Sequence, residues 1–426
     1  MMLLFFLISL VFADNIYDVN KSLTNVKEFD KIIEYSLKNK DIDSIYGTFD
    51  KFKNLKVINL SGNNLNSFDI NLSSLDSLVE IDLSKNKFSS IPEVIFNCKN
   101  LKTLNLSKNE INFLDPRVFN ISSLEKLIIS NNHIIEINND FGNNTNLKHL
   151  NLSNNSINYF NINLTKLVSL TYLDISNNKI STIPGSIVKL NQLNELNLSE
   201  NDIYELPDGF CYLEKLEKLD LSNNNLKEIP DNFGNLFRLK SLNLNDNNLE
   251  KLPSSFNKLI KLNALFLSNL GTNSLKSNIG SFKEVINLDL SNNKFESIPD
   301  FFANYTNLKY LIMRNNELKS IDSNICYLSS LESIDLAKNQ IDSISQNITC
   351  LSQLRIINLN ENKLKVLPDY LFNLNSLTSV SLNSNLIEEV PDIQFSNIKI
   401  LQLRNNFLTE TTILKLKELN NLKVYY

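Results

Sequence analysis

Apolar residues recur along this chain with a constant period, as at Leu55, Leu78 and Leu101. The pattern L-x-x-L-x-L-x-x-N-x-L first begins at Leu55, which starts copy 1, and returns after every 23 positions without an insertion as far as Leu377. A sixteenth copy begins at Ile398 after a step of 21 positions. Sixteen copies in register predict a repeat protein in which each copy packs on its neighbours, because one copy alone buries too little apolar surface to fold.

The spacing inside each copy predicts a short strand. Positions 4 and 6 are apolar while positions 3, 5 and 7 are mostly polar, which is the alternation of a half-buried strand. Strands one period apart return to the same side of the chain, so we expect them to pair in parallel. Positions 1, 11, 14, 18 and 21 are also apolar and are expected to point inward. Eight of the nine prolines stand at position 15, where they end regular structure and begin the return.

Position 9 is asparagine in 15 of the 16 copies. We interpret these residues as an inward ladder whose side-chain amides satisfy backbone groups where each strand bends into a loop. Copy 10 is the exception, because Leu270 stands at this position. The ladder asparagines are therefore expected to be structural.

These motifs resemble those of the leucine-rich repeat family over nearly the whole chain. The second half of a copy often reads I-P-x-x-I/F-x-x-L, as at Ile183, Pro184, Ile187 and Leu190. This is similar to the 23-residue class of Ras-group repeat proteins and of secreted fungal and protist relatives of the L domain-like type. The resemblance implies an α/β solenoid, a horseshoe of about 16 repeats. Its concave face would carry a continuous parallel sheet that binds a macromolecule, and its convex side would be irregular or short-helical.

The two ends of the chain are expected to cover the repeats. Residues 1–13 predict a cleaved signal peptide, because the apolar run over 3–12 is too short to span a bilayer and precedes a switch to polar residues. The alternative is an apolar arm that docks on the fold. Residues 14–54 predict an N-terminal cap, which is either helical over 22–37 or a degenerate repeat from Ile32.

The repeats then occupy residues 55–409, and residues 410–426 predict a C-terminal cap. This cap is expected to contain a closing helix over 411–419 and a last strand over 422–426. No further run is apolar enough to span a membrane, so we expect no stable membrane span once the leader is cleaved.

Composition argues against an enzyme and against nucleic-acid binding. The 42 basic and 47 acidic residues leave no large basic patch. The two histidines, His133 and His149, fall at different positions of neighbouring copies, where we expect them on the surface and too far apart for one site. Phosphate-binding loops, zinc motifs and nucleophile elbows are absent from the sequence. We therefore expect no cofactor, metal or catalytic residue.

Four cysteines in 426 residues are too few for a disulfide scaffold. Cys98 stands at position 21, which is normally leucine, and is expected to be a small buried apolar residue. Cys211 is five copies away from both Cys98 and Cys326 and cannot reach them. Cys326 and Cys350 lie on adjacent copies with an offset of one position, so a disulfide between them and two free thiols both stay open.

The outward strand positions 3, 5 and 7 are the candidate binding surface. Copies 10 to 14 depart there from the polar pattern, and exposed aromatic residues beside arginine are typical of an interface hot spot. The alternative is drift in a long array. The five residues expected to centre this surface, which we call the patch, are Phe266, Tyr310, Ile312, Arg314 and Ile356.

Position 5 alternates asparagine with aspartate over the first nine copies, broken only by Ile128. This alternation keeps like charges two strands apart, which reduces their repulsion. It is either a polar track for a glycan or polypeptide, with Asp174 and Asp220 as its charged residues, or a solvated surface. Tyr172 and His149 are weaker binding candidates in the same half of the chain.

Sequons for N-glycosylation are frequent, partly because the repeat itself often spells Asn-Leu-Ser. Four of them stand at position 5, where glycans would obstruct the N-terminal half of the concave face. Binding is then expected in the C-terminal half, where two further sequons lie off the strands. The asparagines concerned are Asn59, Asn105, Asn151, Asn197, Asn304 and Asn347.

Taken together, the sequence predicts a non-enzymatic, secreted, monomeric protein that binds a protein partner through the concave face. A secreted glycan-binding protein that uses the Asn/Asp track is the second hypothesis. A cytoplasmic scaffold similar to Ras-group repeat proteins is the third.

Overall fold

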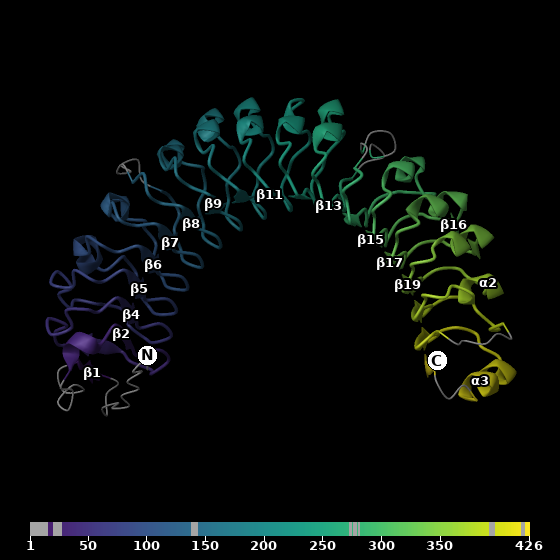
Figure 1. The fold of residues 1–426 in the computed structure, drawn as a ribbon, viewed down its shortest axis with the longest axis horizontal. Coiled ribbons are helices and arrows are strands. Elements are labelled where there is room, and N and C mark those ends of the chain that lie inside the picture. The colour runs from purple at the N-terminus through teal and green to yellow at the C-terminus, as the bar shows by residue number, and fades with distance from the viewer. Residues whose placement is uncertain are drawn as a thin grey trace. The chain divides into compact units, whose positions relative to one another are not determined.

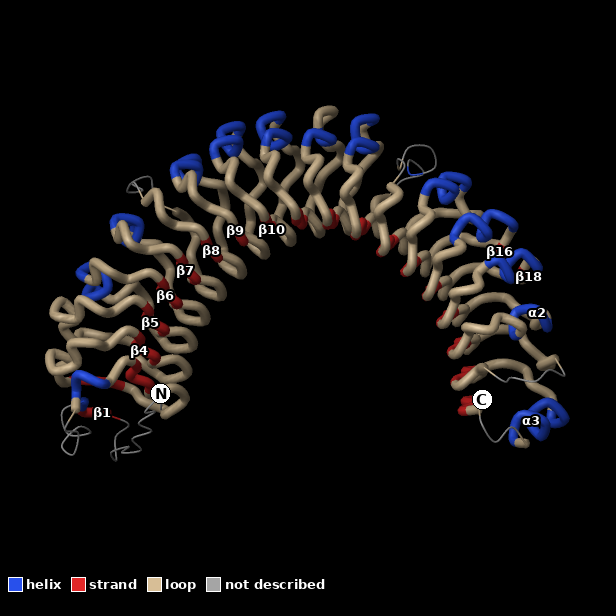
Figure 2. The backbone as a smooth tube through the Cα atoms, in the orientation of Figure 1, coloured by secondary structure: helices blue, strands red, loops and turns tan. Residues whose placement is uncertain are grey.

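The computed structural model describes residues 16–19, 28–137, 144–271, 275, 279, 282–391, 397–418 and 422–426. The chain divides into two compact units, Met1–Leu216 and Glu217–Tyr426. Each unit is a stack of short chain turns, with strands along one side and short helices along the other (Figure 1, Figure 2).

The first unit contains a parallel sheet and a row of 3-10 helices on the opposite side. A separate pair of parallel strands, β1 and β3, lies near its N-terminal end. The strands are β1 Ile16–Asp18, β2 Glu34–Ser36, β3 Ser44–Tyr46, β4 Val57–Asn59, β5 Glu80–Asp82, β6 Thr103–Asn105, β7 Lys126–Ile128, β8 His149–Asn151, β9 Tyr172–Asp174 and β10 Glu195–Asn197. The helices are η1 Phe29–Lys31, η2 Glu93–Asn97, η3 Pro116–Asn120, η4 Ile162–Lys166, η5 Gly185–Lys189 and η6 Asp208–Tyr212.

The second unit repeats this arrangement. Its small second sheet pairs β16 with β18 on the helical side. The strands are β11 Lys218–Asp220, β12 Ser241–Asn243, β13 Ala264–Phe266, β14 Asn287–Asp289, β15 Tyr310–Ile312, β16 Ser320–Ile321, β17 Ser333–Asp335, β18 Ser343–Ile344, β19 Ile356–Asn358, β20 Ser379–Ser381, β21 Ile400–Gln402 and β22 Lys423–Tyr425. The helices are η7 Phe233–Asn235, η8 Ser254–Lys258, η10 Asp300–Asn304, η11 Ser323–Leu328, η12 Gln346–Cys350, α2 Asp369–Phe372 and α3 Glu410–Lys417.

The strand register follows the sequence period. Within each unit a main-sheet residue pairs with the residue one period later, as Ile58 does with Ile81 and Leu288 with Leu311. The one shorter step joins Val380 to Leu401. The inward positions are buried as expected; in copy 6 all seven are at most 5% exposed, at Leu170, Leu173, Ile175, Ile180, Ile183, Ile187 and Leu190. The predicted solenoid with parallel strands is therefore confirmed.

Each strand ends in the same backbone turn. Position 8 has a left-handed conformation in every copy, from Gly62 with φ of 70° to Asn405 with φ of 56°. This conformation is strained for most residue types and is best tolerated by glycine and asparagine. Asn39, at position 8 of the degenerate copy from Ile32, shares it with φ of 55°. The turn thus identifies the segment from Ile32 as a repeat.

The expected helix over residues 22–37 is wrong where this segment is described. Glu34–Ser36 is strand β2, paired in parallel with β4, and only Phe29–Lys31 forms a short 3-10 helix. Tyr35 and Leu37, at positions 4 and 6 of a copy from Ile32, are buried, whereas Ile33 is 45% exposed, and this alternation is that of a repeat strand. Residues 1–15 and 20–27, which include the expected leader, lie outside the described residues. At the other end, α3 and β22 stand where the closing helix and the last strand are expected.

The asparagine ladder connects neighbouring copies through the core. In copy 4 the amide nitrogen of Asn132 donates to the carbonyl oxygens of Leu106 and Ile129, each at 3.0 Å. Its oxygen accepts from the backbone N–H of Ile111, also at 3.0 Å. The side chain is 6% exposed. One buried amide therefore satisfies backbone groups of two copies, as the sequence predicts.

Removing one ladder amide should cost far more than removing an exposed one. Asn132→Ala leaves the N–H of Ile111 and two carbonyl oxygens without this partner, so we expect a loss of about 3 kcal/mol in the free energy of unfolding. Asn158→Ala, at an exposed position of the next copy, should change it by less than about 0.5 kcal/mol. Urea unfolding of both variants measures the difference, and equal losses would refute the structural role of the ladder.

Candidate functional site

Side chains at positions 3 and 5 form the outward face of the main sheet in each unit, whereas the small residue expected there at position 7 is buried in most copies. Most side chains at position 5 also stabilise the strand end that carries them. In copy 1 the side-chain oxygen of Asn59 accepts from the backbone N–H of Ser61 at 3.0 Å and from its hydroxyl at 2.7 Å. The same bond to the N–H at position 7 is made by Asp82, Asn105, Asn151, Asp174, Asn197, Asp220, Asn243, Asp289, Asp335 and Asn358.

This turn gives the Asn/Asp track a structural role that the sequence analysis missed. A signal was present, since Asn or Asp at position 5 is usually followed by Ser at position 7. Asp220 is held further, because its second oxygen accepts from the amide of Asn243 at 3.1 Å. The second oxygen of Asp174 lies 3.4 Å from both the Asn151 amide and the Tyr172 hydroxyl. Both predicted track carboxylates are therefore engaged within the sheet.

Tyr172 and His149 come together on neighbouring strands of the first unit. Their rings stack with centroids 4.0 Å apart and planes 7° from parallel. Burial lowers the pKa of His149, and nearby Lys126 lowers it further against the opposing charges of Asp174 and Glu195. Burial and the charge of Asp174 raise the pKa of Tyr172 to about 12. The pair is thus a fixed, uncharged element of the sheet face at neutral pH.

The five patch residues lie on three strands of the second unit. Phe266 is on β13, Tyr310 and Ile312 are on β15 with Arg314 just after it, and Ile356 is on β19. Strands β14 and β17 separate them, so they do not form one continuous apolar cluster. Tyr310 is 43% exposed and Ile356 47% exposed, whereas Phe266 and Ile312 are half-buried.

We call the bond from the N–H at position 7 to an Asn or Asp side chain at position 5 the local rule. Copy 12 breaks this rule at both positions. Ile312 offers no side-chain acceptor, and Arg314 replaces the usual small polar residue. Where Phe266 interrupts the rule in copy 10, the oxygen of Asn245 accepts from the N–H of Ser268 instead. In the described part of the chain, the N–H of Arg314 has no such side-chain acceptor. Copy 12 therefore gives up a stabilising bond while presenting an aromatic, an aliphatic and a cationic side chain.

Tyr310 is positioned by a neighbouring ion pair. Its hydroxyl lies 3.5 Å from a carboxylate oxygen of Glu332, and the other oxygen of Glu332 binds the ammonium of Lys309 at 2.8 Å. This pairing lowers the pKa of Glu332 and raises that of Lys309. Lys309 is exposed and Glu332 is half-buried at the surface, so the pair orients the tyrosine and adds little stability.

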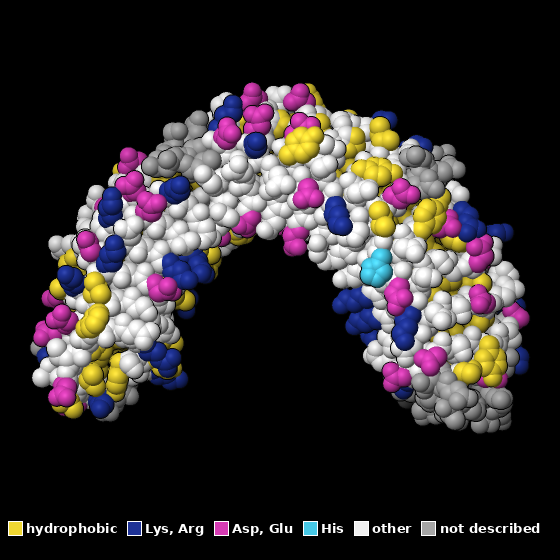
Figure 3. Space-filling model, turned by 180° about the vertical axis from the view of Figure 1, so that it is seen from behind, with side chains coloured by type: hydrophobic (Ala, Val, Ile, Leu, Met, Phe, Trp, Pro, Cys, Tyr) yellow, Lys and Arg dark blue, Asp and Glu magenta, His cyan; other side chains and the backbone are white. Residues whose placement is uncertain are grey.

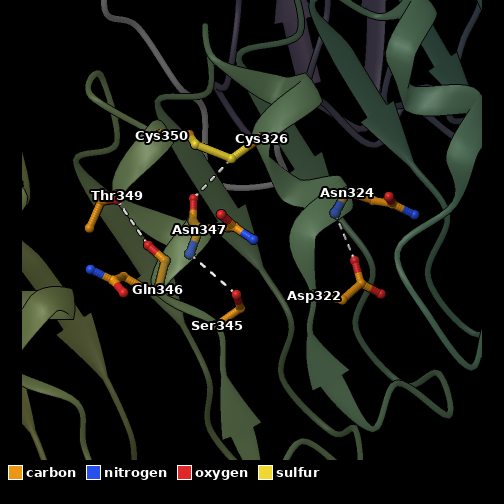
Figure 4. Close-up of a disulfide and its surroundings, with 8 residues drawn as sticks. All are labelled: Asp322, Asn324, Cys326, Ser345, Gln346, Asn347, Thr349 and Cys350. Carbon is orange, nitrogen blue, oxygen red and sulfur yellow. Dashed lines mark hydrogen bonds between the residues drawn. A yellow bond between two sulfur atoms is a disulfide. The ribbon is translucent and has the colours of Figure 1, made fainter.

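Cys326 and Cys350 are bonded to one another on the helical side of the second unit (Figure 4). Their Cα atoms are 5.2 Å apart, so the offset of one repeat position is accommodated between η11 and η12. The carbonyl oxygen of Asn347 lies 3.2 Å from the Cys326 sulfur. The other two cysteines, Cys98 and Cys211, are buried free thiols whose pKa values burial raises to about 11.

The six candidate glycosylation sites divide into two environments. Those at position 5, Asn59, Asn105, Asn151 and Asn197, are half-buried, and each side-chain oxygen is bound by the serine of its own sequon. Asn304 and Asn347 are exposed at the 3-10 helices η10 and η12. Glycan occupancy at all six stays a prediction.

The described residues contain no cluster of His, Cys, Asp or Glu arranged to hold a metal ion. Within the same ranges, no helix has both the length and the apolar character needed to cross a bilayer. Basic and acidic side chains are interspersed over the face seen in Figure 3.

Comparison with protein families agrees with the repeat geometry. The leucine rich repeat family model matches residues 76–134, 122–180, 162–203, 192–249, 283–341, 306–364 and 329–387, more than half of the chain. The chain belongs to the leucine-rich repeat family. No curated protein sequence matches this leucine-rich repeat protein.

Solved leucine-rich repeat structures share the fold. A protein from Leptospira interrogans superimposes with a TM-score of 0.79 at 24% identity, over 96% of this chain and 98% of that one. The ectodomain of the Arabidopsis thaliana receptor kinase GASSHO1/SCHENGEN3, solved with CASPARIAN STRIP INTEGRITY FACTOR 2, gives 0.61 at 25% identity. That match covers 96% of this chain and 51% of the ectodomain chain, so this chain spans about half of its length.

A second receptor gives a similar TM-score and sequence identity. The plant peptide hormone receptor RGFR1, solved in complex with RGF2, gives a TM-score of 0.59 at 26% identity, over 92% of this chain and 64% of that one. These likenesses confirm the solenoid class. The Ras-group subclass and the secreted L domain-like type stay predictions.

Proposed function

We propose that this leucine-rich repeat protein is a non-enzymatic scaffold that binds a protein partner through the outward sheet face of its second unit. Leucine-rich repeat domains commonly act as protein-binding scaffolds, and two of the similar structures are receptors with bound ligands. The patch residues centre the surface. The partner contacts Tyr310 and Ile312 first, with Ile356 and Phe266 at either side.

The observation that carries the proposal is the break in the local rule at β15. Elsewhere, position 5 mostly serves the strand end, so its side chain contributes to stability. At Ile312 that contribution is given up, and at Arg314 a long cation stands where most other copies have a small polar residue. Tyr310 lies next to them and is 43% exposed. Its hydroxyl contacts the carboxylate of Glu332. Rigid aromatic side chains beside arginine supply much of the binding energy at protein interfaces.

The proposed place of action is outside the cytosol. The Cys326–Cys350 disulfide supports it, because disulfides persist in oxidising compartments and are rare in the cytosol. The apolar run over residues 3–12 supports it from the sequence. Glycans at Asn304 and Asn347 would then lie on the helical side and leave the patch accessible.

The binding surface is tested by a double substitution with a matched control. Tyr310→Ala/Ile312→Ala should weaken binding of the protein partner at least tenfold, since it removes the apolar centre of the interface. Tyr327→Ala is the control, because Tyr327 is 44% exposed but lies in η11 on the helical side. The partner is isolated by cross-linking to the full chain, and affinities are then measured by calorimetry. Unchanged affinity in the double variant, or equal loss in the control, would exclude this surface.

Secretion is tested by peptide mapping of protein expressed with its own leader in a eukaryotic host. The medium should contain a chain that starts at Asp14, with a linked peptide pair containing Cys326 and Cys350. Mapping of the lysate from the same culture is the control. An uncleaved chain with four free thiols, confined to the lysate, would contradict the extracellular assignment.

A further inference from the structure

Five strands of the second unit present an alternating row at position 5. The register aligns β13, β14, β15, β17 and β19 without a shift, so adjacent members of the row are one strand apart. Apolar and acidic side chains alternate over its first four members, and the fifth is an asparagine. In order, its members are Phe266, Asp289, Ile312, Asp335 and Asn358.

Each of the two carboxylates in this row is held by one oxygen, and its second oxygen is available to a partner. One oxygen of Asp289 accepts from the N–H of Ser291 at 2.8 Å, and one of Asp335 accepts from the N–H of Ala337 at 3.0 Å. Neither second oxygen has a hydrogen bond or ion pair with a described residue. Arg314, just after β15, likewise forms no ion pair within the described ranges. Each aspartate therefore presents a preorganised acceptor on either side of Ile312.

The spacing of the row matches one kind of secondary structure in a partner. Neighbouring strands are about 4.8 Å apart, so the three steps from Phe266 to Asp335 span about 14 Å. An α-helix presents residues i, i+3, i+7 and i+10 on one face, and ten residues rise about 15 Å. An extended strand presents side chains on one face about 6.8 Å apart, so four of them span about 20 Å.

We propose that the partner presents an α-helix laid along this row, with apolar residues at i and i+7 and basic residues at i+3 and i+10. The apolar pair meets Phe266 and Ile312, and the basic pair meets the second oxygens of Asp289 and Asp335. Tyr310 and Ile356, exposed at position 3 of β15 and β19, flank the helix. This inference rests on the proposed function and names the chemistry of its partner.

The test uses the full chain and a labelled peptide that forms about five helical turns on an alanine and glutamine background. The probe carries Leu, Lys, Leu and Lys at i, i+3, i+7 and i+10; a second peptide carries Glu in place of both lysines. Fluorescence anisotropy should show the lysine peptide binding at least tenfold more tightly than the glutamate peptide. Its affinity should also fall as salt is raised.

Matched variants separate charge from structure. Asp289→Asn/Asp335→Asn keeps the oxygen that accepts the backbone N–H, as asparagine does at position 5 of other copies, and removes both charges. All variants are produced without glycosylation in a bacterial host, because asparagine at 289 or 82 creates an Asn-Leu-Ser sequon. It should weaken the lysine peptide at least tenfold and leave thermal unfolding unchanged. Asp82→Asn is the control, because Asp82 makes the same bond to Ser84 in the first unit. It should leave peptide binding unchanged.

Each outcome decides for or against the helical basic partner. Equal binding of the two peptides, binding of neither, or full binding to the Asp289→Asn/Asp335→Asn variant would overturn it. The proposed function is judged separately by Tyr310→Ala/Ile312→Ala and the natural partner. If that double variant weakens the natural partner while the aspartate variant binds it normally, the surface stands and the partner chemistry is wrong.

Discussion

The buried asparagine at position 9 is the interaction on which the rest of this structure depends. A parallel strand that turns away after three residues leaves backbone donors and acceptors inside the core, where unpaired groups are costly. One amide with two donor hydrogens and an acceptor oxygen satisfies groups of its own copy and of the preceding one, as Asn132 does. This bond requires each copy to lie one strand from the next in a fixed register, which explains the constancy of the repeat period.

A second set of bonds follows from the same turn and decides which outward residues are free to bind. The oxygen of Asn or Asp at position 5 holds the N–H at position 7, so a polar sheet face is largely a structural feature. Asp220 illustrates this, because both of its oxygens are engaged. A side chain that breaks the rule, such as Ile312, contributes nothing to the strand end. Its presence is therefore better explained by what lies outside the sheet.

The sequence predicts the solenoid, its inward positions and the ladder, because each pattern is repeated in many copies and a deviation in one copy does not hide it. Features that occur only once in the chain are not predicted in this way. Residues 22–37 fit a helical spacing, and only the pairing of Glu34–Ser36 with β4 shows a strand there. The stacking of His149 on Tyr172 and the approach of Cys326 to Cys350 depend on side-chain directions in adjacent copies, which a period does not specify. The sequence identifies the patch residues one by one. Only the strand register shows that Asp289 and Asp335 lie between them in one row.

The most direct measurement is hydroxyl-radical footprinting of the full chain, free and bound to its protein partner. Tyr310 and Ile356 are both well exposed in the free protein and should lose reactivity on binding. Tyr327, on the helical side of the same unit, and Tyr172, in the first unit, should keep theirs. Protection of Tyr327 or Tyr172 with no protection of Tyr310 would contradict a binding surface on the outward face of the second unit.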